Sequence, residues 1–80
     1  MKLKIVFQTI EYVERYVKIV SMYEDVSIDI SYGKYLVDGK SLLGILSMGL
    51  NKELEINILT NVYPEELPLK LITIFEAQEM

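Results

Sequence analysis

The segment Val37–Leu50, VDGKSLLGILSMGL, decides the fold of this 80-residue chain. Its fourteen residues include three glycines, two serines and seven large apolar side chains, a mixture that fits neither a solvated loop nor an ordinary amphipathic helix. Asp38 and Gly39 predict a turn, and Ser41 after it is a favourable N-cap residue. We therefore expect a very short helix that begins after Ser41 and ends at Gly49.

Residues 42–47 of this short helix are almost all apolar, with one glycine among them. Gly44 costs roughly 1 kcal/mol relative to alanine, so close packing below it or close approach of a partner above it must offset the loss. The leucines and isoleucine cover nearly the whole circumference, and so short a helix cannot bury all of them against one sheet. We therefore predict a partner-docking surface, with simple core packing as the alternative; its residues are Leu42, Leu43, Leu46 and Met48.

The flanking sequence predicts strands by alternation and helices by steps of three and four. Thr9 is suited to cap the first helix, and Gly33-Lys34 turns one strand back on the next as a hairpin. The last segment, residues 67–78, has helical spacing, although its LITIF run also suits a strand. The expected strands are Leu3–Gln8, Val26–Tyr32, Tyr35–Val37 and Glu53–Ile58, and the expected helices are Ile10–Tyr23, 42–47 and 67–78.

This order of elements, βαββαβα, predicts one α+β domain over residues 1–80. Each strand has one polar face, so the three helices must all cover the other face of a four-stranded antiparallel sheet, an open-faced sandwich. The first helix is long enough to be a crossover, which makes the first two strands parallel to each other. The fourth strand can then fill the slot between them in the antiparallel direction.

Composition excludes several kinds of chemistry. The chain has no cysteine and no histidine, which removes thiolate catalysis and the usual general base and nitrogen metal ligand. A net charge of −4 argues against nucleic acid as a partner. No run approaches the about 18 apolar residues of a membrane helix, so we expect a cytoplasmic protein that binds no membrane. Because the chain lacks histidine and cysteine, we also expect no bound metal, and we expect no cofactor.

The segment Lys40–Gly49, KSLLGILSMG, resembles the signature of HPr, the histidine-containing phosphocarrier of the bacterial sugar phosphotransferase system. In that family the signature reads K-S, two apolar residues, G, two apolar residues and S-L-G, and the same order of strands and helices surrounds it. The resemblance extends at lower specificity over nearly all of the chain. It implies the HPr-like form of the open-faced sandwich described above.

The resemblance also implies that this chain is no histidine phosphocarrier and no enzyme. Counting back from Ser41, Ile10 stands where the family's phosphoryl-accepting histidine lies, and Tyr12 stands where its arginine lies. Glu11 between them adds a charge that repels phosphate. In Gram-positive members the motif serine is phosphorylated by an ATP-dependent kinase, which makes Ser41 the candidate for regulatory phosphorylation, while a plain N-cap role is the alternative.

The sequence thus predicts a regulatory or protein-binding relative of the phosphotransferase system, with phosphotransferase or catabolite-control proteins as partners. The alternative is a scaffold module that docks or forms a homodimer without any phosphate chemistry. A carrier that uses another residue as phosphoryl acceptor is a third reading.

Overall fold

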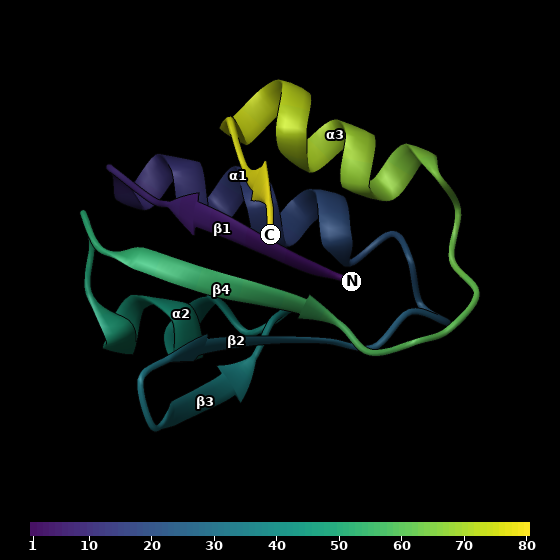
Figure 1. Cartoon of the computed structure of the whole chain (residues 1–80). Coiled ribbons are helices and arrows are strands. Elements are labelled where there is room, and N and C mark those ends of the chain that lie inside the picture. Colours follow the sequence, from purple (N-terminus) through teal and green to yellow (C-terminus); the bar gives the residue numbers. More distant parts are fainter.

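The computed structural model describes residues 1–80 as five strands and three helices in the order βαββαβαβ (Figure 1). The α+β class and the three helices are as predicted, whereas the sheet has five strands in place of four. The strands are β1 Lys2–Val6, β2 Ile28–Tyr32, β3 Tyr35–Asp38, β4 Glu53–Ile58 and β5 Gln78–Glu79, and the helices are α1 Ile10–Val20, α2 Leu42–Met48 and α3 Glu66–Phe75.

The sheet order is β3-β2-β4-β1-β5, and all neighbouring strands are antiparallel. β4 lies between β1 and β2, with Ile56 opposite Leu3 on one side and opposite Ile30 on the other. β1 and β2 therefore run parallel to each other without being neighbours, as the crossover through α1 predicted. The β2–β3 hairpin forms the outer edge at the bottom of Figure 1.

The core lies between one face of the sheet and the three helices. In β1, β2 and β4 every second residue is buried, in the pattern expected of a sheet with one dry face. Buried residues from all three helices join the same cluster, so the helices share that face and leave the other face to solvent. The cluster includes Leu3, Ile5, Ile30, Leu54 and Ile56 from the sheet and Val13, Tyr16, Ile45, Leu67, Leu71 and Phe75 from the helices.

Close packing explains two glycines of the Val37–Leu50 segment, and backbone conformation explains the third. A Cβ at Gly39 would lie 2.6 Å from Ile28 Cγ2, and a Cβ at Gly44 would lie 3.3 Å from Val37 Cβ. Gly49 ends α2 with φ 92°, a backbone conformation that suits glycine. Gly44 therefore lets α2 pack closely on β3. This packing explains the glycine without a partner above it.

The C-terminal segment departs from the prediction, because α3 ends at Phe75 and is followed by β5. Glu76 adopts the left-handed conformation, with φ 56°, and its backbone N–H donates to Leu71 O. The chain then turns along β1, where Gln78 lies opposite Lys4. Hydrogen bonding to the free edge of β1 decides this strand, since its residues have little strand propensity of their own.

Candidate functional site

Ser41 lies at the N-cap of α2 and is half-buried. Its Oγ accepts a hydrogen bond from the Gly44 N–H at 3.1 Å, as an N-cap serine should. The turn before it is held by the Lys40 N–H, which donates to Asp38 Oδ1 at 2.9 Å. The first turn of α2 contains no acidic residue, so the cap oxygen has no anion of the same helix beside it.

The four predicted docking residues occupy different environments. Leu43 is 79% exposed and points away from the core, while Leu42 and Leu46 are half-buried against it. Met48 is only 7% exposed and belongs to the core, so the prediction that it offers a docking surface is not supported by its position. The helical period explains the difference, because Ile45 and Met48, three residues apart, form the inner face of α2.

The start of α1 is where the resemblance places the phosphoryl-accepting histidine. Thr9 caps the helix by accepting a hydrogen bond from the Tyr12 N–H at 3.2 Å. Ile10 is half exposed, and Glu11 is an exposed acid in the first turn. The Tyr12 ring packs edge-on against Phe75, with 5.7 Å between the ring centroids.

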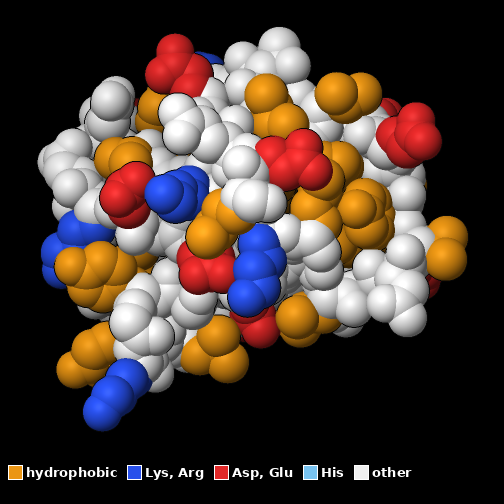
Figure 2. All heavy atoms as spheres, viewed as in Figure 1, with side chains coloured by type: hydrophobic (Ala, Val, Ile, Leu, Met, Phe, Trp, Pro, Cys, Tyr) orange, Lys and Arg blue, Asp and Glu red, His pale blue; other side chains and the backbone are white.

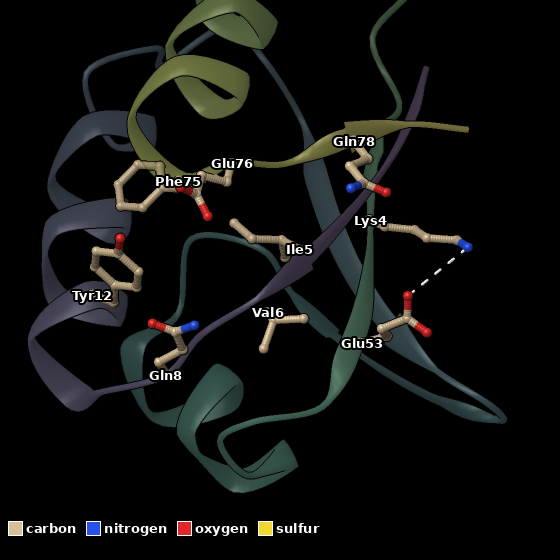
Figure 3. Close-up of a pocket in the computed structure, with 9 residues that line it drawn as sticks. All are labelled: Lys4, Ile5, Val6, Gln8, Tyr12, Glu53, Phe75, Glu76 and Gln78. Carbon is tan, nitrogen blue, oxygen red and sulfur yellow. Dashed lines mark ion pairs between the residues drawn. The ribbon is translucent and has the colours of Figure 1, made fainter.

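A pocket of about 270 Å³ lies beside this helix start, between β1 and the end of α3 (Figure 3). Lys4 and Glu53 approach each other at its rim, with 3.9 Å between Nζ and Oε1. Its lining combines carboxylates, amides and apolar surface without any cluster of charge: Lys4, Ile5, Val6, Gln8, Tyr12, Glu53, Phe75, Glu76 and Gln78. No sequence pattern predicted this pocket, because the pocket depends on the left-handed turn at Glu76 that brings Gln78 beside Lys4.

The loop after α2 lies against the segment that leads into α1. The Asn51 N–H donates to Phe7 O at 2.9 Å, and Phe7 is buried directly before that segment. The loop after the C-terminal end of α2 is therefore hydrogen-bonded to the segment before α1, whereas Ser41 lies at the opposite end of α2. No group of three or more His, Cys, Asp or Glu residues is placed to hold a metal ion.

Two groups have shifted pKa values, and neither lines the pocket or contacts Ser41. Burial raises the pKa of the Tyr16 phenol, with a smaller contribution from the negative charge of Asp38. The Lys70 ammonium donates to the Tyr23 hydroxyl at 3.0 Å, and this hydrogen bond is the main cause that raises its pKa.

Comparison of the chain with protein-family models, with curated proteins and with solved structures found no match. None of the three helices has the length and apolar character needed to span a bilayer.

Proposed function

We propose that this chain is a regulatory, protein-binding module with the HPr-like fold that has lost histidine phosphocarrier activity. Support comes from the strand order, with β4 between β1 and β2, and from three helices over one sheet face. The KSLLGILSMG segment supports it as well, because it forms α2 with the motif serine at the cap. Its partners in this proposal are cytoplasmic proteins of the phosphotransferase system or of catabolite control.

The observation that carries the proposal is the juxtaposition of Ser41 and Leu43 at the start of α2. One residue offers a hydroxyl at a helix end, and the other offers an apolar side chain that is 79% exposed. A phosphate on Ser41 would add about −1.5 to −2 charge where the helix dipole and free amides favour an anion. Phosphorylation would thus change the charge of the docking surface while leaving the cap and the core intact.

Loss of the phosphocarrier function follows from the residues at the start of α1. Ile10 has no group that can accept a phosphoryl group, and Tyr12, at the position of the family's arginine, carries no positive charge that could hold a phosphate. Glu11 in the same turn repels a phosphate. The chain contains no histidine that could take over the relay.

The test is incubation with ATP and HPr kinase, followed by location of the phosphate by mass spectrometry. We expect one phosphate on Ser41 and none on the Ser41→Ala variant. Ser47→Ala is the matched control, because Ser47 is an exposed serine of the same helix whose hydroxyl donates to Gly44 O. Absence of label on Ser41, or label on Ser47 instead, would refute the regulatory proposal.

A second incubation, with phosphoenolpyruvate and the first enzyme of the phosphotransferase system, tests the loss of carrier activity. We expect no phosphoprotein, and a stable one would mean that another residue accepts phosphate. The second candidate function, a scaffold module without phosphate chemistry, is favoured by the cap hydrogen bond from Gly44 to Ser41, which explains the serine by itself. An unlabelled protein in both incubations leaves the scaffold function as the conclusion.

A further inference from the structure

Strand β3 is the longer of the two free edges of the sheet (Figure 1). The opposite edge is β5, which has only two residues, whereas β3 has four. Short edge strands are one way in which proteins avoid pairing with other chains, and prolines and bulges are others. β3 contains no proline and pairs with β2 in one uninterrupted register.

The hydrogen bonds to β2 show which backbone groups of β3 face outward. The Gly39 N–H donates to Ile28 O at 2.8 Å, and the register places Val37 opposite Ile30 two residues further along. Since hydrogen-bonded pairs alternate in an antiparallel ladder, Val37 and Tyr35 point their backbone groups at β2. Leu36 therefore presents both its N–H and its C=O to the free edge, together with the Asp38 N–H.

The side chains of β3 are unusually apolar for an exposed edge. Tyr35 is 73% exposed and Leu36 is 64% exposed. Figure 2 shows the same feature as hydrophobic side chains at the surface of the β2–β3 hairpin, at the lower left. Edge strands that face only water usually place charged residues at such positions.

The charges around β3 are unbalanced within one chain. Asp38 lies directly opposite Asp29 of β2, and like charges at such a position destabilise a sheet. The ion pairs of the chain involve other residues: Lys2 with Glu55, Lys4 with Glu53 and Lys70 with Glu66. Lys34, in the hairpin turn, likewise has no acidic partner.

We propose that β3 pairs in the antiparallel direction with β3 of a second copy of this chain, about a two-fold axis at Leu36. In this register Leu36 lies opposite Leu36 of the second copy. On both sides of the axis, Tyr35 of one copy lies opposite Val37 of the other, and Lys34 of one copy lies opposite Asp38 of the other. The outward backbone groups of Leu36 meet those of the second copy, as a hydrogen-bonded pair requires. Each aspartate pair gains a lysine from the other chain, so the strand is complementary to itself in charge as well as in backbone.

A second copy fits this edge better than an unrelated extended peptide. Any strand can supply backbone hydrogen bonds to a sheet edge. The two Lys34–Asp38 pairs, by contrast, arise only when the same sequence is read in both directions through Leu36. The contact area of a four-residue strand is small, so the dimer is weak and forms in a concentration-dependent way.

Sedimentation equilibrium from about 10 µM to about 1 mM tests the proposal, since contacts of this size are transient. We expect dimers to accumulate as the concentration rises. Lys34→Asp and Asp38→Lys should each weaken dimerisation at least about tenfold, because each replaces two attractive pairs with two repulsive ones. Lys18→Asp, an equal change of charge on α1, should leave dimerisation unchanged.

An equimolar mixture of the Lys34→Asp and Asp38→Lys chains gives the most specific readout. In the mixture every charge of one chain meets an opposite charge of the other, so a heterodimer should form although neither variant dimerises alone. A folding defect in either variant cannot produce this rescue, and circular dichroism of each variant checks its fold. A wild-type chain that stays monomeric throughout, or a dimer unaffected by both reversals, would overturn the proposal.

Discussion

The phenol of Tyr16 is the feature of the core with the clearest energetic consequence. The side chain is fully buried, and its Oη has no hydrogen-bond partner. Its ring packs edge-on against Phe7 and Phe75, with centroid separations of 5.1 Å and 6.0 Å. Tyr16→Phe would keep these ring contacts and remove only the unsatisfied hydroxyl.

The expected change in stability follows from two opposing terms. Burying a hydroxyl without a partner costs about 1–3 kcal/mol, which the variant recovers. The void left by one oxygen, roughly 15 Å³, costs only about 0.4 kcal/mol at the rate found for core cavities. We therefore expect Tyr16→Phe to stabilise the fold by about 0.6–2.6 kcal/mol, which corresponds to a rise in Tm of roughly 2 °C or more.

Urea unfolding followed by circular dichroism measures this change, with an unchanged m-value showing that the unfolding transition is the same. Tyr35→Phe is the matched control: its side chain is 73% exposed, so removing its hydroxyl should change stability by no more than about 0.5 kcal/mol. A loss of stability in Tyr16→Phe would refute the reasoning. It would mean that the hydroxyl is hydrogen-bonded to a buried water molecule, and that Tyr16→Phe leaves this water without its partner.

Three further predictions concern single elements of the fold. Gly39→Ala should destabilise the fold by about 1–3 kcal/mol, because the new Cβ would lie 2.6 Å from Ile28 Cγ2 and 2.9 Å from Ile28 O. Thermal unfolding measures this loss, and an unchanged Tm would mean that β2 can move aside. Thr9→Ala should lose about 0.5–2 kcal/mol with the hydrogen bond from the Tyr12 N–H, and Thr9→Ser should restore most of it. Above pH 10.0, the ordinary pKa of tyrosine, the unfolded chain releases the Tyr16 proton before the folded chain does, so stability should fall as pH rises, by at most about 1.4 kcal/mol per pH unit. Tyr16→Phe should flatten this decline, and an equally steep decline in the variant would contradict the assignment.

The fold was predictable wherever one local signal decided the structure. Thr9 and Ser41 both cap their helices as expected, alternation located β1, β2 and β4 on the correct dry face, and the Gly33-Lys34 turn located β3. Boundaries were less certain, and α1 ends at Val20 instead of reaching Tyr23. The Tyr23 N–H donates to Val20 O, a tighter turn than the α-helical one, and no single residue type signals it.

What the sequence could not predict depends on contacts between distant segments. The pairing of β5 with β1 needs an open edge at β1, which exists only once the sheet has formed. The pocket beside α1 needs the left-handed turn at Glu76. A glycine at this position would have predicted such a turn, but a glutamate does not. Met48 was assigned to the surface because seven apolar residues crowd a short segment, while the helix phase that buries it is set by the packing of Gly44 on β3.

On the solvent face of the sheet, the folded monomer and the proposed dimer use the same kind of contact between opposite charges. On the β1 side of this face, acids of β4 find lysines on the neighbouring strand, at 3.3 Å for Lys2 and Glu55. On the β3 side the sheet ends, and Asp29 with Asp38 has no further strand to supply a lysine. Cross-strand pairing of opposite charges is the same stabilising rule in both places. A second β3 provides the missing strand and carries its lysine at the required position, so dimerisation extends the pattern of the monomer instead of adding a new kind of contact.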